Sequence, residues 1–348
     1  MSNKDAVQHL DTDKLRPYLQ QHVPGFRGPF SAEKFSGGQS NPTFKLTASS
    51  GVYVLRRQPP GTLLKSAHAV DREYRVLKAL ANTEVPVAKV HHLCEDTSVL
   101  GSMFYIMDFC DGNIYWGAAL PEAQDNRQRT AMYYEMNRVL AALHDVDIDA
   151  AGLSDYGKPG NYFARQFERW SGQYIASELQ PISAMNQLIE QLPQAMPAAD
   201  GMVALAHGDY RLDNLMFSKD NSRIIAVLDW ELSTLGHPYA DLAYQCMQMR
   251  LPHSTDRTAM SGLMGVDRKA LGIPSEAEYV ARYCENRGIS GIEHWEFYLA
   301  FSFFRLAAIA QGVAKRASQG NASNKKAAAV GAMVAPLAQF GLQCLHEK

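Results

Sequence analysis

The sequence is poor in cysteine and has no excess of charge of either sign. Its 348 residues include five cysteines, an odd number, and no pair has the CxxC spacing of a zinc or redox site. We therefore expect reduced, buried thiols in a cytoplasmic protein rather than a disulfide framework. The formal net charge of −2 gives no reason to expect nucleic acid or an anionic membrane as a partner.

Long apolar runs are also missing. Residues 1–15 contain no apolar core, so they do not have the pattern of a signal peptide. The most apolar segment, residues 297–310, is interrupted by Arg305 and is shorter than a membrane span. We interpret it as a buried helix of a helical region.

Several well-known catalytic motifs are absent. The chain has no GxxxxGK[ST] loop, no HExxH and no GxSxG. These motifs carry the chemistry of P-loop enzymes, zinc proteases and serine hydrolases, so their absence argues against all three classes. The DxH and GNH segments typical of metallophosphohydrolases are missing as well. The composition is otherwise ordinary, with 46% hydrophobic and 20% charged residues, and the length is sufficient for two lobes.

The residue pattern changes along the chain from mixed strand and helix to mostly helix. After a leading helix capped at Asp11 or Thr12, short strand-like runs surround a hairpin tip that contains Gly37 and Gly38. Further elements are expected as an inner strand around residues 53–56, a helix at 67–81, and strands at 89–96 and 102–112. The turn-rich residues 108–112 indicate a boundary between an N-terminal lobe, residues 1–109, and a C-terminal lobe, residues 110–348. Helices are expected in the second part at residues 122–145, 161–178, 184–192, 239–249, 276–287, 293–318 and 325–345.

The most informative segment contains HGDYRLDNLMF and VLDWELSTLGHPYADLAY. Asp209 lies in a polar loop, Asn214 follows five residues later, and Asp229 ends an apolar run. Two carboxylates and an amide in this order are what a kinase needs to orient a hydroxyl and hold Mg²⁺ beside a nucleotide. A single Asp after glycine is usually a turn residue or a helix cap, so the interpretation depends on the ordered set.

These two segments, together with SGGQSNPTFKL, YVLRRQPPG and NYFARQFERW, resemble the aminoglycoside phosphotransferase-like kinases. The resemblance is strongest to the branch related to the kinase domain that accompanies acyl-CoA dehydrogenases, and it runs from about residue 35 to residue 244. It implies an α+β, two-lobed, protein-kinase-like fold. The N-lobe would be a small antiparallel sheet with one main helix, and the C-lobe would be larger and mostly helical.

By position, the resemblance implies that Asp209 is the catalytic aspartate and that Asn214 and Asp229 are the Mg²⁺ ligands. Arg56 stands where protein kinases use a strand lysine, and Glu73 resembles its partner on the helix. Further nucleotide contacts are implied for the hairpin and for the hinge between the lobes, namely Gly37, Gly38, Gln39, Ser40, Asn41, Met107, Asp108, Phe109 and Cys110.

Two departures and two supporting residues complete this comparison. An arginine at position 56 offers a planar, permanently charged fork that still pairs with phosphates and with Glu73, in a different geometry from lysine. Arg57 points the other way in a strand and is an alternative for the same role. His207 and Asp241 are implied to be structural, with Asp241 bracing the catalytic loop. No peptide-docking segment follows Asp229, which favours a small-molecule acceptor over a protein.

The phosphate acceptor is harder to predict from the sequence than the catalytic and nucleotide-binding residues. The helix at residues 161–178 places polar side chains at three- or four-residue steps, which is typical of a solvated face or of a substrate-binding face. We single out Arg211, which follows Asp209 by two residues, and four helix residues, namely Tyr162, Arg165, Gln166 and Arg169. Near-neutral charge and a basic helix give a polycationic aminoglycoside little support, whereas the resemblance implies hydroxyacyl compounds.

We therefore expect an enzyme that uses ATP and Mg²⁺ to phosphorylate a hydroxyl of a small molecule, such as a hydroxyacyl-CoA or a hydroxy acid. The alternatives are an aminoglycoside kinase, an amino-alcohol kinase of the choline or homoserine type, and a non-catalytic nucleotide-binding protein on the kinase scaffold. The presence of all three polar residues, Asp209, Asn214 and Asp229, argues against the last alternative.

Overall fold

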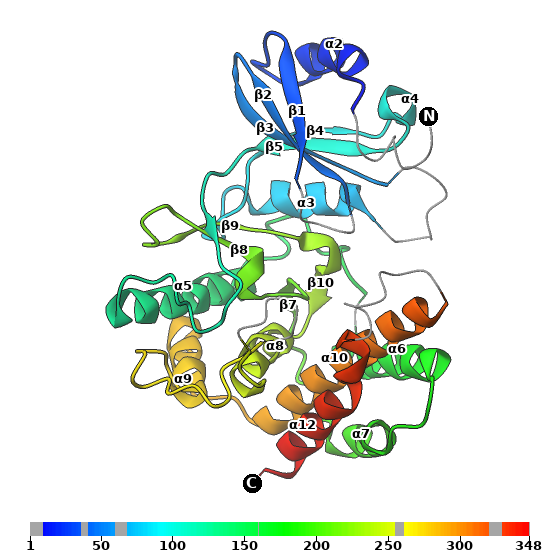
Figure 1. The fold of residues 1–348 in the computed structure, drawn as a ribbon, viewed down its shortest axis with the longest axis vertical. Helices are drawn as coiled ribbons and strands as arrows, with labels where there is room; N and C mark the ends of the chain where they lie inside the picture. The colour runs from blue at the N-terminus through cyan, green and yellow to red at the C-terminus, as the bar shows by residue number, and fades with distance from the viewer. Residues whose placement is uncertain are drawn as a thin grey trace.

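A five-stranded antiparallel sheet forms the N-terminal part of the protein (Figure 1). The computed structural model describes residues 10–35, 41–59, 68–158, 160–254, 261–319 and 329–347. The strand order is β1-β2-β3-β5-β4, and every neighbouring pair runs antiparallel. The strands are β1 (Phe30–Lys34), β2 (Thr43–Ala48), β3 (Gly51–Arg57), β4 (Val90–Cys94) and β5 (Phe104–Asp108).

Two helices cover opposite faces of this sheet. Because successive side chains of a strand point to opposite faces, neighbouring residues of one strand pack against different helices. On one face, α2 (Thr12–His22) contributes Leu15 and Leu19 to a cluster that includes Phe104 and Ile106 of β5. Tyr105 of β5 points the other way and belongs to the cluster that contains the buried residues of α3 (Val70–Leu80). The helix α2 begins as expected at Asp11, whose carboxylate accepts a hydrogen bond from the backbone N–H of Lys14 at 3.1 Å.

The rest of the chain is mostly helical, with a few very short strands near the sheet. The strands form two small antiparallel sheets, one of β7 (Ala204–Ala206) and β10 (Thr234–Gly236), the other of β6 (Asn113–Ile114), β8 (Leu215–Phe217) and β9 (Ile224–Val227). Two 3₁₀ turns, η1 (Leu212–Asn214) and η2 (Trp230–Leu232), precede β8 and follow β9. The principal helices are α5 (Asn126–His144), α6 (Tyr162–Ser177), α7 (Ser183–Ala195), α8 (Pro238–Arg250), α9 (Glu276–Arg287), α10 (Trp295–Ser318) and α12 (Val334–His346).

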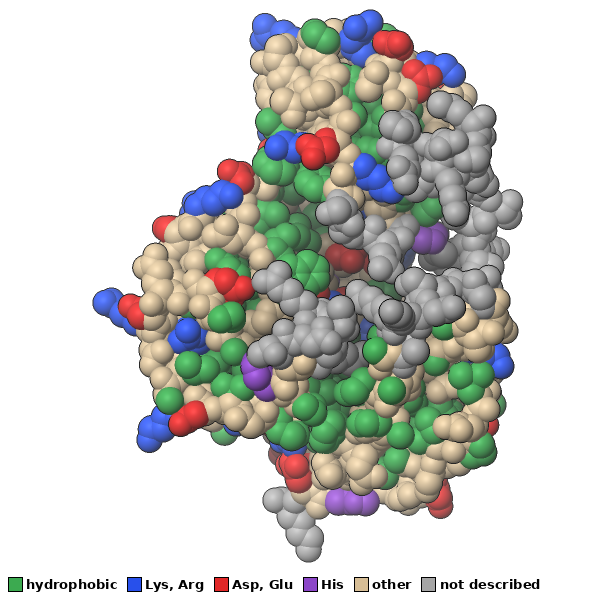
Figure 2. Space-filling view, viewed as in Figure 1, with side chains coloured by type: hydrophobic (Ala, Val, Ile, Leu, Met, Phe, Trp, Pro, Cys, Tyr) green, Lys and Arg blue, Asp and Glu red, His purple; other side chains and the backbone are tan. Residues whose placement is uncertain are grey.

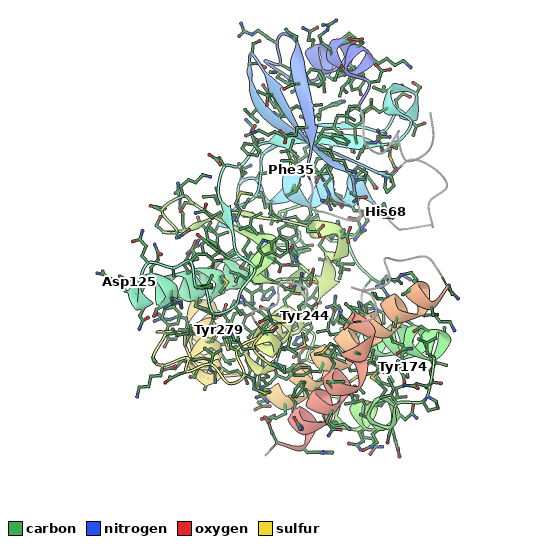
Figure 3. All side chains as sticks on the ribbon, in the orientation of Figure 1. Phe35, His68, Asp125, Tyr174, Tyr244 and Tyr279 are labelled. Carbon is green, nitrogen blue, oxygen red and sulfur yellow. The ribbon has the colours of Figure 1, made fainter. Side chains whose placement is uncertain are left out.

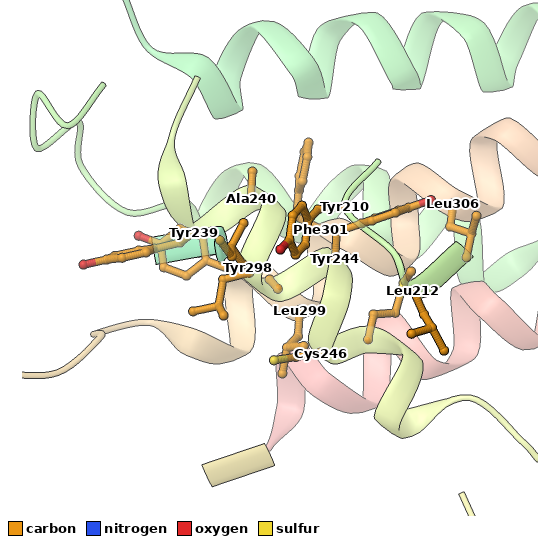
Figure 4. Close-up of a cluster of buried hydrophobic side chains, with 14 of the residues drawn as sticks. Tyr210, Leu212, Tyr239, Ala240, Tyr244, Cys246, Tyr298, Leu299, Phe301 and Leu306 are labelled. Atoms are coloured by element: carbon orange, nitrogen blue, oxygen red, sulfur yellow. The ribbon is translucent and has the colours of Figure 1, made fainter. Parts of the chain in front are cut away.

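The helix α10 is the centre of this helical part. Phe301 and Leu306 of α10 pack with Tyr210, Tyr239 and Tyr244 in one buried cluster (Figure 4). The expectation that its apolar segment is shorter than a membrane span needs correction. Trp295–Ser318 and Ala329–His346 are both long and apolar enough to cross a membrane by length and composition. In α10, however, 83% of the apolar window is buried inside the protein, which is typical of a core helix.

Most of the expected helices are present with small shifts at their ends. The helix predicted at residues 184–192 extends over Ser183–Ala195 and includes Pro193. The strand predicted at residues 102–112 ends at Asp108, and the chain then forms the short strand β6. The boundary between residues 109 and 110 stays a prediction.

Candidate active site

Arg56 of β3 and Glu73 of α3 form a buried ion pair at the inner face of the sheet. The Nε atom of Arg56 lies 2.7 Å from Oε2 of Glu73, and the two side chains are 13% and 2% exposed. The Tyr105 hydroxyl donates to Oε2 of Glu73 at 3.0 Å, and the Asn41 side-chain amide donates to Oε1 at 2.7 Å. Two hydrogen-bond donors and the Arg56 cation therefore hold the Glu73 carboxylate in one orientation.

Arg57 lies on the opposite face of β3, so it does not compete with Arg56. Its Nε atom donates to Oγ of Ser102 at 3.1 Å, and its terminal nitrogen donates to the Leu100 carbonyl at 2.9 Å. Burial lowers the pKa of the Arg57 guanidinium. Of the two arginines, Arg56 is the one that faces Glu73.

Arg56 also contacts Asp229, which comes from the helical part of the chain. A terminal nitrogen of Arg56 lies 2.7 Å from Oδ1 of Asp229. Burial opposes the charge of Arg56, but the carboxylates of Glu73 and Asp229 outweigh this cost and raise the pKa of Arg56. Asp229 has left-handed backbone angles, φ 60° and ψ 63°, between β9 and η2. An aspartate tolerates this conformation better than most residues, and the strain it stores is typical of functional positions.

Asp209 and Asn214 are joined directly within the loop between β7 and β8. The Nδ2 group of Asn214 donates to the backbone carbonyl of Asp209 at 2.9 Å and to Oδ2 of its carboxylate at 3.1 Å. The Leu228 N–H donates to the Asn214 carbonyl at 2.8 Å, and Leu228 directly precedes Asp229. The structure thus brings Asp209, Asn214, Asp229 and Arg56 together at the junction of the sheet and the helical part. Figure 2 shows a hollow between the sheet and the helical part, with an acidic side chain visible inside it.

The loop that carries Asp209 is held from below by Asp241 of α8. Its carboxylate is 1% exposed and accepts hydrogen bonds from the backbone N–H groups of His207 at 2.6 Å and Gly208 at 2.9 Å. Burial alone would raise the pKa of Asp241, but the nearby His144 and the Gly208 N–H outweigh it and lower the pKa. Gly208 has φ +82°, and a Cβ atom there would lie 2.7 Å from the Leu232 carbonyl oxygen. Only glycine fits at this position without strain.

The hinge region follows β5 and is anchored by side-chain contacts. Nε2 of His91 lies 2.6 Å from Oδ1 of Asp108. The Phe109 ring lies parallel to that of Phe35, with 6.5 Å between centroids, and Nζ of Lys45 lies 4.6 Å from the Phe109 ring centroid. Phe35 lies at the end of the sheet that faces the helical part (Figure 3). The predicted nucleotide contacts Gly37, Gly38, Gln39 and Ser40 are outside the described residues.

The predicted acceptor residues are not gathered in one pocket. Arg211 pairs with Asp213 at 2.6 Å and lies 3.4 Å from Oδ1 of Asp209, so the protein's own carboxylates hold it. On α6, the side chain of Gln166 accepts from the Trp170 indole N–H at 3.1 Å, and Arg169 lies over the Trp170 ring at 4.9 Å. A cavity of about 350 Å³ at the start of this helix is lined by Tyr162 and Arg165, with Met202, Val203 and Leu235.

Two residues of the site were missed by the sequence interpretation. Tyr105 contacts Glu73 from β5, and nothing in its apolar strand pattern distinguishes it. Arg305 of α10 donates a hydrogen bond to the carbonyl of Gly208. The signal for Arg305 was present, because it is a charged residue within the most apolar segment of the chain.

Comparison with known proteins identifies relatives of this chain. A model of the phosphotransferase enzyme family matches residues 31–288. The chain is 47% identical over 332 residues to acyl-CoA dehydrogenase family member 10 of Mus musculus. The aligned region covers 95% of this chain and 31% of that protein. The chain therefore spans less than a third of the length of this relative.

Two solved structures extend the comparison. One, from Ralstonia eutropha and assigned to the aminoglycoside phosphotransferases, has a TM-score of 0.88 and 50% identity, with 97% of this chain and 98% of that chain covered. The other is aminoglycoside phosphotransferase APH(4)-Ia in a ternary complex with AMP-PNP and hygromycin B. It has a TM-score of 0.63 and 16% identity, covering 96% of this chain and 99% of that chain. The α+β kinase-like fold expected from the sequence is confirmed.

We predict that Gly208→Ala destabilises the protein by about 2 kcal/mol or more, because a Cβ atom collides with backbone at a positive φ. Urea unfolding followed by circular dichroism measures the change. The matched control is Gly291→Ala, where a Cβ atom meets nothing within 4 Å. Equal stability of the two variants would contradict the tight loop geometry.

Proposed function

Because the chain belongs to the phosphotransferase enzyme family, we propose that it is a small-molecule kinase. It transfers the γ-phosphoryl group of ATP to a hydroxyl group with the help of Mg²⁺. The observation that carries this proposal is the convergence of Asp209, Asn214 and Asp229 with the Arg56–Glu73 pair. Phosphoryl transfer requires positioning and charge stabilisation more than covalent chemistry, and these five side chains supply both.

Asp209 is proposed to receive the substrate hydroxyl. Its side chain is 24% exposed, so one edge is open to an incoming group while Asn214 contacts Oδ2. A carboxylate in hydrogen-bond reach of the hydroxyl orients it for attack and accepts its proton. Arg211 lies 3.4 Å from the other carboxylate oxygen and places a cation beside Asp209.

Asn214 and Asp229 are proposed to hold Mg²⁺. The Nδ2 group of Asn214 is engaged with Asp209, which leaves the amide oxygen as its ligand atom. Among the described residues, no group of three or more His, Cys, Asp or Glu side chains is arranged to hold a metal. This fits Mg²⁺ in a kinase, because one or two protein oxygens share the ion with substrate phosphates and water. When bound, the ion neutralises charge on the phosphates.

Arg56 is proposed to contact the phosphates of the nucleotide. Its Nε atom is paired with Glu73, and the guanidinium offers five N–H donors in total, so others remain for phosphate oxygens. The proposed nucleotide site is completed by residues 37–40, which the sequence predicts to be a hairpin tip, and by the hinge residues Met107 and Cys110. A nucleotide analogue, AMP-PNP, is bound in the APH(4)-Ia structure, which supports this part of the proposal.

We propose an anionic hydroxylated acceptor, such as a hydroxy acid or a hydroxyacyl-CoA. Arg211 places a cation beside Asp209, and Asp213 is already paired with Arg211. Two further arginines, Arg165 and Arg169, belong to α6. A polycationic aminoglycoside needs free carboxylates, which this arrangement does not favour. The name of the mouse relative, which refers to acyl-CoA dehydrogenases, supports an acyl-CoA-type acceptor.

The acceptor class is tested by acceptor-dependent release of ADP from ATP and Mg²⁺. The panel contains hydroxyacyl-CoAs of several chain lengths, the free hydroxy acids, choline, homoserine and aminoglycosides. We expect turnover with the anionic acceptors, because Arg56 and Arg211 place two cations beside Asp229 and Asp209. Turnover only with aminoglycosides or amino alcohols would contradict the proposed acceptor class while preserving the reaction class.

We predict that Asp209→Asn lowers kcat by about 10³-fold, because the amide keeps the shape of the side chain but cannot accept the proton. The affinity for ATP, measured by isothermal titration, should change little. The control is Asp13→Asn, an exposed position of α2 distant from the site. A folded Asp209→Asn protein that turns over near the wild-type rate would rule out the role assigned to Asp209.

A further inference from the structure

Arg305 carries a buried charge that the machinery described above does not use. It lies in the otherwise apolar helix α10 and is 7% exposed. One terminal nitrogen donates to the Gly208 carbonyl oxygen. Its Nε group is buried without a hydrogen-bond partner, and no ion pair with a carboxylate joins it to another residue in the described part of the chain.

The surroundings of Arg305 offset only part of the cost of burying it. Its guanidinium carbon lies 5.0 Å from the ring centroid of Tyr244 on α8 and 5.6 Å from that of Trp170 on α6. Burying an unpaired cation costs several kcal/mol, whereas cation–π contacts each return about 0.5–2 kcal/mol. An apolar side chain at this position would favour stability, so stability does not explain the arginine. Its hydrogen bond to the Gly208 carbonyl explains it better.

The group that Arg305 holds is the peptide bond immediately before Asp209. The carbonyl of this peptide accepts from Arg305, and its N–H, which belongs to Asp209, donates to Nδ1 of His207 at 3.2 Å. The preceding N–H, that of Gly208, is bound by Asp241 at 2.9 Å. Because Gly208 is the residue with the fewest conformational restrictions, this peptide needs outside contacts to hold its plane.

We propose that Arg305 is a positioning residue for Asp209, an inference that rests on the proposed function of the site. The orientation of the 208–209 peptide plane sets the direction in which the Asp209 side chain leaves the backbone. Arg305 fixes the oxygen edge of that plane and His207 fixes the hydrogen edge. A displacement of a catalytic group by about 1 Å lowers turnover by about 100-fold.

Arg305 also connects the catalytic loop to α6, the helix that carries the proposed acceptor residues. Trp170 covers the guanidinium and at the same time donates to Gln166. Tyr244 covers it from α8, and burial, together with the charge of Asp209, raises the pKa of the Tyr244 hydroxyl. In Figure 4, Tyr244 lies in the buried cluster beside Leu306, the next residue of α10. The loop and α6 are thereby held as one unit.

The test compares Arg305→Met and Arg305→Lys with Arg282→Met, an exposed arginine of α9 that pairs with Glu285. We expect Arg305→Met to lower kcat by about 100-fold, while the KM for ATP stays within about 2-fold. Arg305→Lys should recover about 10-fold of that loss, because an ammonium keeps a donor for the carbonyl with a poorer fit. The control variant should match the wild type. A residue that only stabilised the fold would not produce this separation of kcat from KM.

Hydrogen exchange of the Asp209 amide supplies a readout that does not depend on turnover. In Arg305→Met, after correction for the measured change in global stability, we expect the exchange to accelerate by about 10-fold or more, because one edge of the peptide is released. Should Arg305→Met fail to fold, Arg305→Lys decides, with an intermediate kcat expected. Wild-type kcat and wild-type exchange in any folded Arg305 variant would overturn the positioning role. If the wild type turned over no acceptor in the panel but the exchange effect were present, the proposed function would fail and the structural role of Arg305 would stand.

Discussion

The contacts of Arg56 with Glu73 and Asp229 join three of the segments from which the site is built, namely β3, α3 and the turn after β9. Glu73 belongs to the helix on the inner face of the sheet, whereas Asp229 follows a strand of the helical part, 173 positions along the chain from Arg56. Because the guanidinium is a planar fork, it contacts both carboxylates at 2.7 Å without moving. A lysine would present one ammonium to the same pair. The arginine therefore determines how closely the sheet approaches Asp229, and the proposed phosphate site depends on that approach.

The loop that carries Asp209 is held by a second set of contacts, which come from α8 and α10. Asp241 fixes the N–H groups of His207 and Gly208, and Arg305 fixes the Gly208 carbonyl. Both partners are buried and charged, and each contacts backbone groups of the loop. Asp241 also lies 3.5 Å from Nε2 of His144. A loop that carries a catalytic group gains rigidity from such contacts, since the donors and acceptors of the backbone cannot rotate independently. This arrangement explains why an apolar helix contains an arginine.

Much of the fold and part of the site could be predicted from the sequence, because they depend on local patterns. Long amphipathic helices have a clear period, and Asp209 and Asn214 lie five residues apart in one short motif. The remaining features depend on contacts between distant positions. Arg305 contacts Gly208, 97 positions away along the chain. Tyr105 cannot be told from the other residues of its apolar strand by sequence, and only the fold places it against Glu73. Strands of two to four residues, such as β6 and β9, are too short to show a period of two.

We propose that Asn214 and Asp229 together hold the metal that accompanies the nucleotide at Arg56. The most direct test is a crystal structure with AMP-PNP and Mn²⁺, recorded at a wavelength where manganese scatters anomalously. We expect an anomalous peak in contact with the amide oxygen of Asn214 and the carboxylate of Asp229, with phosphate oxygens beside Arg56. A nucleotide bound elsewhere, or a metal that contacts neither residue, would contradict it.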